Sequence, residues 1–128
     1  MKSDPIPFLV SYLKTVPSVP KDSPTGSLVG REVGEVTIYA FHSGGFRVVR
    51  DSMDRADIIY DVYHKDRASA ASLAYLTREA LLENLPGKAV DGVQVLDVQE
   101  ISSPRYMPDA VSLEDAYSGE VSIFYTEI

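Results

Sequence analysis

The chain has 128 residues, of which 45% are hydrophobic and 24% charged, and its formal net charge is −7. This length fits one domain with its own core, and the acidic balance argues against a nucleic-acid-binding protein, whose affinity comes largely from neutralising phosphates. The absence of cysteine excludes disulfides and thiolate chemistry, and without a membrane-length apolar stretch or a signal-peptide pattern we expect a soluble protein made in the cytoplasm.

The first predicted element is a helix over residues 5–16. Asp4 is a favourable N-cap, Pro5 lies at the helix position that tolerates proline best, and Pro17 ends the run. Apolar residues recur on one face of this helix, at Phe8, Leu9, Tyr12, Leu13 and Val16. The helix is therefore expected to pack on a core through that face.

An extended connection is predicted for residues 17–34, because prolines and glycines punctuate this segment and no hydrophobic periodicity runs through it. Leu28 and Val29 are its expected anchors on the core. The connection leads into residues 35–66, where a strand pair is predicted.

The predicted strand pair has an unusual turn. Val36–Phe41 and Asp57–His64 are rich in β-branched and aromatic residues, which pack well on a sheet. The segment between them is far longer than the two-residue turn of a minimal hairpin. Its Ser43-Gly44-Gly45 sequence lacks the lysine and hydroxyl residue of a phosphate loop, so the glycines are interpreted as supplying positive φ angles for a bend. We therefore predict a projecting hairpin tip that contacts another molecule.

A second helix is predicted over residues 67–85, after the N-cap Asp66, and Pro86-Gly87 ends it. Residues 93–126 predict another strand pair, with a long proline-bounded loop between the strands. The order helix-strand-strand-helix-strand-strand favours an α+β fold in a single domain, 1–128. We expect one antiparallel sheet of about four strands with two helices packed on one face.

No constellation in the sequence predicts catalysis or a bound cofactor. His42 and His64 lack the spacing of a metal-binding pair. A group of aspartates lacks the alternating ligands of an EF-hand loop, namely Asp51, Asp54, Asp57 and Asp61. No serine lies in a Gly-x-Ser-x-Gly elbow. We therefore expect a protein that is not an enzyme and that holds no metal or cofactor.

Two segments carry residue types that are enriched at protein interfaces. The first is the hairpin tip, with the candidate residues Gly44, Gly45, Phe46, Arg47, Val48 and Arg50. The second is the loop after residue 102, with the candidate residues Arg105, Tyr106 and Met107. Each has a structural alternative: Phe46 could fold back onto the core, and Tyr106 could pin an ordinary surface loop.

A series of short motifs runs through nearly the whole chain. In order they are the helix Asp4–Val16 with Pro17, the strand Val36–Gly45, Arg50-Asp51, the strand Asp57–His64, the alanine-rich helix Ala68–Leu85 with Pro86-Gly87, Val95–Ile101, Ser103-Pro104, Met107–Asp109 and the strand Glu120–Thr126. This order resembles the tail terminator proteins of long-tailed, siphovirus-type bacteriophages, especially those that infect actinobacteria. The chain departs from that family in residues 110–119, which are longer or more acidic, and in its ending, Glu127-Ile128.

The resemblance implies a small α+β subunit that forms a homohexameric ring in the virion tail and neck, after synthesis in the host cytoplasm. Such a ring caps the tail tube, stops its polymerisation and joins the tail to the head. Its partners would be the major tail tube protein and a head-side neck or connector protein, with DNA passing through without specific binding and no membrane involved. One alternative is another head–tail joining or minor tail protein. A different class, a small ligand-binding or enzymatic α+β domain, would require a concave pocket with convergent polar groups.

Overall fold

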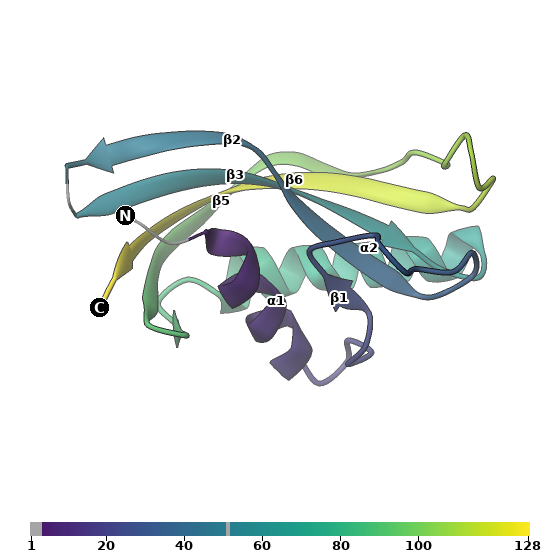
Figure 1. Ribbon diagram of the computed structural model, residues 1–128, viewed down its shortest axis with the longest axis horizontal. Coiled ribbons are helices and arrows are strands. Elements are labelled where there is room, and N and C mark those ends of the chain that lie inside the picture. Colours follow the sequence, from purple (N-terminus) through teal and green to yellow (C-terminus); the bar gives the residue numbers. More distant parts are fainter. Residues whose placement is uncertain (1–3, 51) are drawn as a thin grey trace.

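The computed structural model describes residues 4–50 and 52–128. Six strands form one curled sheet in the order β1-β2-β3-β6-β5-β4, and two helices lie in its hollow (Figure 1). The strands are β1 (Pro24–Thr25), β2 (Thr37–Val49), β3 (Met53–Tyr63), β4 (Ala89–Val90), β5 (Val93–Tyr106) and β6 (Ala116–Glu127). The helices are α1 (Pro5–Thr15) and α2 (Arg67–Glu79), which continues as a π-helical turn, η1 (Ala80–Asn84).

The expected sheet of about four antiparallel strands with two helices packed on one face is wrong. The sheet has six strands and is mixed, because β1 pairs in parallel with β2, placing Pro24 opposite Ile38. The two additional strands, β1 and β4, have two residues each and are too short to show the alternation by which a strand is recognised. The long strands curl into a half-barrel around the helices (Figure 1).

Two strands also run farther than the sequence suggested. β2 continues through Ser43-Gly44-Gly45 to Val49, so the connection to β3 is confined to residues 50–52 and the expected over-long loop is mostly paired strand. β5 continues through Pro104, where a loop was expected. Proline is tolerated there because this part of β5 is at the edge of the sheet and needs no further donor on that side.

The helices follow local signals more closely. The Asp4 side chain accepts a hydrogen bond from the Ile6 amide at 3.0 Å, and Asp66 accepts one from the Ser69 amide at 2.8 Å, as N-caps do. In η1 the Leu85 amide donates to the carbonyl of Ala80, one residue farther than in an α-helix. No helix in the described part of the chain combines the length and apolar character that crossing a bilayer requires.

The core lies between the helices and the concave face of the sheet. Alternate residues of β3 point into it and are buried, at Ala56, Ile58, Tyr60 and Val62. The residues between them, including Asp57, Ile59 and Asp61, lie on the opposite side and are partly exposed. We call this side the outer face. The turn between β2 and β3 lies at one end of the sheet, the tip end. The loops before β2 and before β6 lie at the other, the loop end (Figure 1).

Two buried tyrosines, Tyr12 and Tyr60, differ in whether their hydroxyl groups are hydrogen-bonded. The Tyr12 hydroxyl donates to the carbonyl of Ala80 at 2.7 Å and joins α1 to η1. The Tyr60 side chain is fully buried, and its hydroxyl has no hydrogen-bond partner among the described residues. Burial raises the pKa of the Tyr60 hydroxyl well above its usual value, so it stays neutral.

We predict that Tyr12→Phe lowers the free energy of unfolding by about 1 kcal/mol, the usual net contribution of a hydrogen bond. Tyr60→Phe should leave that free energy unchanged or raise it, because it removes a buried polar group that makes no bond. Urea denaturation of the two variants and the parent chain measures both effects. If Tyr60→Phe lowered the free energy of unfolding more than Tyr12→Phe, the Tyr60 hydroxyl would have to make a stabilising bond, and the assignment of an unbonded hydroxyl would be wrong.

Candidate functional site

The hairpin tip, residues 43–50, lies at the end of β2 and is exposed along its length. The Phe46 side chain is 59% exposed, so it does not fold back onto the core. β3 pairs with the tip along β2, and β6 in turn pairs with β3 as far as Asp54, which lies opposite Tyr125. The tip is therefore hydrogen-bonded to the sheet on one side. Beyond Tyr39, none of the described strands pairs with the outer edge of β2. The tip is therefore a firm, exposed edge and not a loose loop.

A cation–π arrangement holds Phe46 on the outer face. The Arg55 guanidinium lies 5.2 Å from the centroid of the Phe46 ring and 5.9 Å from that of Phe124. Its Nε donates to Asp57 Oδ1 at 2.8 Å, and that oxygen also accepts a hydrogen bond from Ser122 Oγ at 2.8 Å. The aromatic ring is thus presented to solvent in a defined position.

The paired glycines of the tip have a different role from the one expected. A register shift between His42 and Gly44 marks a β-bulge, so the glycines lie inside a strand and not in a bend. Of the two glycines, Gly44 and Gly45, only Gly45 has a positive φ, +136°. A Cβ added to Gly45 would lie 2.2 Å from the carbonyl oxygen of Arg55, so this position requires glycine for the close approach of β2 and β3.

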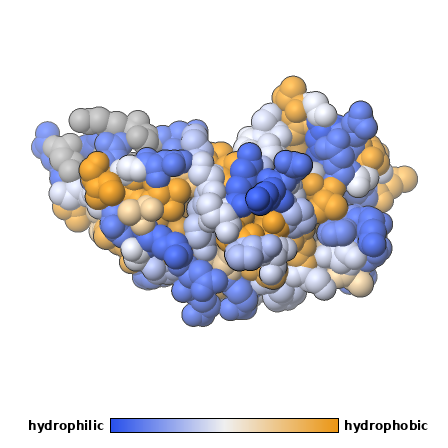
Figure 2. Space-filling model, turned by 90° about the horizontal axis from the view of Figure 1, so that it is seen from below, coloured by the Kyte–Doolittle hydropathy of each residue, from blue (hydrophilic) through white to orange (hydrophobic). Residues whose placement is uncertain are grey.

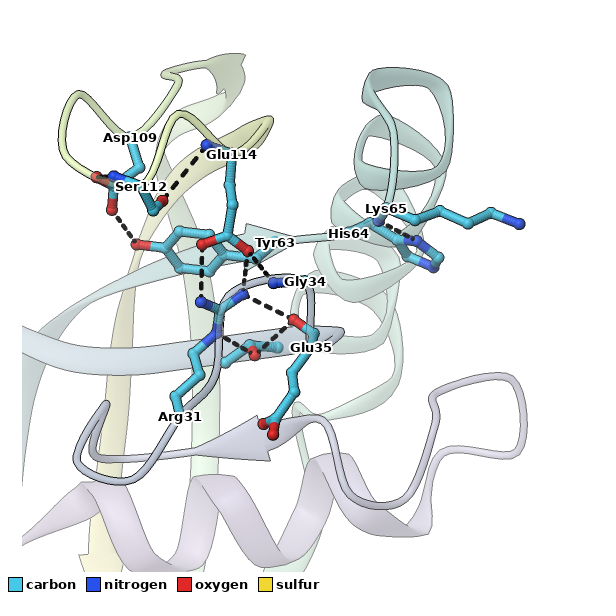
Figure 3. Close-up of polar contacts among 10 residues, drawn as sticks. Arg31, Gly34, Glu35, Tyr63, His64, Lys65, Asp109, Ser112 and Glu114 are labelled. Carbon is cyan, nitrogen blue, oxygen red and sulfur yellow. Dashed lines mark hydrogen bonds and ion pairs between the residues drawn. The ribbon is translucent and has the colours of Figure 1, made fainter.

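The loop end contains a buried ion pair that the sequence did not reveal (Figure 3). The Arg31 guanidinium donates to both oxygens of Glu114, from Nη1 to Oε1 at 2.8 Å and from Nη2 to Oε2 at 2.6 Å. The two side chains are only 11% and 8% exposed. Arg31 also donates to Thr37 Oγ1 and to the carbonyl of Glu35, and its guanidinium lies 4.4 Å from the centroid of the Tyr63 ring. The hydrogen bonds from Arg31 lower the pKa of Glu114 to about 2.

This ion pair fastens two loops that expose apolar side chains. Val29 is 93% exposed on the first loop, which overturns its expected role as an anchor, and Val111 is 94% exposed on the second. Val33 is also exposed on the first loop, and Leu113 on the second. We call these four residues the loop-end patch. Seen from the helix side, hydrophobic atoms are visible near both ends of the long axis (Figure 2).

The second predicted interface segment divides into two parts. The Tyr106 hydroxyl donates to Asp115 Oδ1 at 2.6 Å, and the Arg67 guanidinium lies 3.9 Å from the Tyr106 ring centroid, so this tyrosine pins the structure locally. Arg105 and Met107 are exposed. Arg105 forms no ion pair with any described residue. These two residues, and not Tyr106, are available to a partner.

Arg105 and Met107 lie at a pocket of about 360 Å³ on the outer face, which we call the outer-face pocket. Phe41 and Ile59, which face each other across β2 and β3, line it together with Asp61. Burial raises the pKa of Asp61 above its usual range; a hydrogen bond with Ser118 opposes the shift and the nearby Asp109 adds to it. Asp61 has no ion-pair partner among the described residues. A carboxylate between apolar walls is suited to an organic cation.

The remaining candidates for chemistry do not converge. Nε2 of His42 lies 3.4 Å from Asp4 Oδ1, and Nδ1 of His64 accepts a hydrogen bond from the Lys65 amide. His64 lines a second pocket, of about 410 Å³, beside α2. Across residues 4–50 and 52–128, no cluster of three or more histidine and carboxylate side chains is placed to hold a metal ion. Asp51, one member of the acidic group, lies outside the described residues.

No protein-family model matches the chain, and no curated protein matches it in sequence. The resemblance to tail terminators therefore stays a prediction.

Proposed function

We propose that the protein is a structural virion subunit of the tail-terminator type, which forms a closed ring of six copies. The observation that carries the proposal is that the two ends of the sheet present different exposed surfaces. The tip end presents Phe46 with Arg47 and Arg50, and the loop end presents the loop-end patch. A head-to-tail ring needs two unlike patches on every subunit, whereas a two-fold dimer uses one patch twice.

In this role the ring caps the tail tube, stops its growth and offers a further surface to the neck on the head side. The net charge of −7 suits a channel through which DNA slides without being held, since phosphates find little attraction there. The proposed work is mechanical, with no catalytic step and no cofactor. Another head–tail joining or minor tail protein would share the ring geometry but would not bind the end of the tube.

One observation favours a second candidate function, a small ligand-binding domain. The outer-face pocket combines apolar walls with the partly buried carboxylate of Asp61, which are the features of a site for a small organic cation. A binding domain of this kind needs no ring and can bind its ligand as a single copy. Its behaviour in solution therefore separates it from the tail-terminator proposal.

The mass of the purified protein, measured by light scattering alone and after addition of the tail tube protein that the proposal implies, tests the proposal. We expect a ring of six copies, at the latest when the tube is present. The double variant Phe46→Asp, Arg47→Asp should keep its fold but lose the ring, whereas Ser72→Asp, at an exposed position of α2, should keep both. A protein that stays monomeric at high concentration with tube protein present would contradict the proposal.

A further inference from the structure

We infer that the hairpin tip of one copy docks in the outer-face pocket of the next copy, where a tip arginine pairs with Asp61. This inference rests on the proposed head-to-tail assembly. It assigns the contact between neighbouring copies to the tip and the outer-face pocket, and it leaves the loop-end patch as the further surface for the tube or the neck. The occupant of the pocket is thus a second copy of this chain.

The pocket side of the contact offers one carboxylate, that of Asp61, which has no ion-pair partner among the described residues. Asp61 alternates with the core residues Tyr60 and Val62, which directs its side chain to the outer face. Asp109 already accepts hydrogen bonds from the amides of Val111 and Ser112. Of the residues that line the pocket, Arg105 carries a positive charge and Asp61 and Asp109 carry carboxylates. The lining therefore has an excess of negative charge and favours a positively charged group.

The tip side offers the matching chemistry. Arg47 and Arg50 are exposed, and neither forms an ion pair within the described part of the chain. The apolar side chains of Phe46, Val48 and Val49 are exposed beside them. A guanidinium with an apolar stem can fill a pocket with apolar walls while its planar head pairs with a carboxylate. Charge and apolar surface therefore complement each other across the two sites.

One chain cannot make this contact with itself. Asp61 lies seven positions along β3 from Asp54, the residue paired with Arg47, which corresponds to about 23 Å at about 3.3 Å per residue. The pocket and the tip are thus separated along a single rigid hairpin. A contact between them must join two copies through unlike surfaces, which is the geometry that closes a ring.

The absence of cysteine allows a direct test by disulfide trapping. Ser52→Cys introduces a thiol beside the tip, and Ala110→Cys introduces one beside Asp109 at the pocket; both positions are exposed. Under mild oxidation, with tube protein present, the double variant should form a ladder of covalent oligomers that ends at the closed ring. The matched pair Ser52→Cys, Ser72→Cys places the second thiol on α2 and should form no ladder.

Charge reversal then tests the role of Asp61. Adding Asp61→Lys should slow formation of the ladder by about tenfold or more, because a charge pair in a desolvated contact is lost. Glu83→Lys makes the same charge change at an exposed site and should not slow it. Adding Arg47→Glu and Arg50→Glu to Asp61→Lys should restore the ladder. If Asp61→Lys does not fold, as judged by its melting temperature, the milder Asp61→Asn replaces it and should also slow trapping.

The outcomes separate this inference from the proposed function. Rings that form without a tip-to-pocket disulfide, or a ladder that Asp61→Lys and Asp61→Asn leave unchanged, would overturn the docking but keep the ring. A protein that binds propylguanidine as a monomer and never cross-links would overturn both in favour of a ligand site.

Discussion

Replacing Glu114 by alanine should lower the free energy of unfolding at pH 7 by about 3 kcal/mol, the scale for removing one partner of a buried ion pair. The guanidinium of Arg31 would lose both of its bonds to the carboxylate while it remains only 11% exposed. The Gly34 amide would also lose its acceptor, Glu114 Oε2. Because these bonds join the two loops of the loop-end patch, we expect the loops to open first.

The effect of Glu114→Ala should depend on pH in a defined direction. The folded pKa of Glu114, about 2, is below the value of 4.5 for an unperturbed glutamate. The stabilisation by its carboxylate is therefore complete above about pH 4.5 and is lost as the pH falls toward 2. The difference in unfolding free energy between the parent chain and the variant should shrink over this interval.

Urea denaturation at several pH values measures this difference. Glu32→Ala is the matched control, since Glu32 lies in the same loop but is exposed, and its effect should stay within about 0.5 kcal/mol. Equal losses for Glu114→Ala and Glu32→Ala at pH 7 would show that the ion pair does not stabilise the loop end.

Replacing Gly119 by alanine should lower the free energy of unfolding by about 3 kcal/mol, the upper part of the usual range for overpacking a core. Gly119 lies opposite Tyr60 in the pairing of β6 with β3, and the tyrosine ring covers it. A Cβ at Gly119 would lie 2.4 Å from both Cζ and Oη of Tyr60. Since Tyr60 is fully buried, its ring has no free space to enter.

A double-mutant cycle distinguishes this clash from a general intolerance of side chains at Gly119. Tyr60→Leu removes the far end of the ring, so Gly119→Ala should cost much less in that background than in the parent chain. Thermal or urea denaturation of the four proteins supplies the cycle. Strictly additive losses would mean that contact with Tyr60 is not the reason for glycine at this position.

The features that sequence reasoning could predict are those with local causes. Asp4 and Asp66 act within one helical turn of the amides that they cap, so their roles are visible in the sequence itself. Ser43-Gly44-Gly45 suggested the end of a strand because glycines usually break one, but the bulge accommodates them within β2. The tip with Phe46 was predicted as an interface candidate. Phe46 is exposed and does not fold back onto the core, and its role in an interface stays a prediction.

The features that were missed depend on contacts between distant segments. Arg31 and Glu114 are 83 positions apart, and neither belongs to a recognisable pattern. Asp61 was considered only as one of four aspartates that do not form a calcium loop, whereas the assembled sheet places it on the outer face beside Met107, which follows the end of β5. A pocket of this kind forms only when the sheet is assembled, so neither the sequence of β3 nor that of the segment after β5 predicts it on its own.

Electron microscopy of tails assembled with this protein tests the central proposal most directly. We expect a ring of six copies at the head-side end of the tube, with each copy contacting its two neighbours through unlike surfaces. Single copies scattered along the tail, pairs related by a two-fold axis, or tails capped normally without the protein would contradict it.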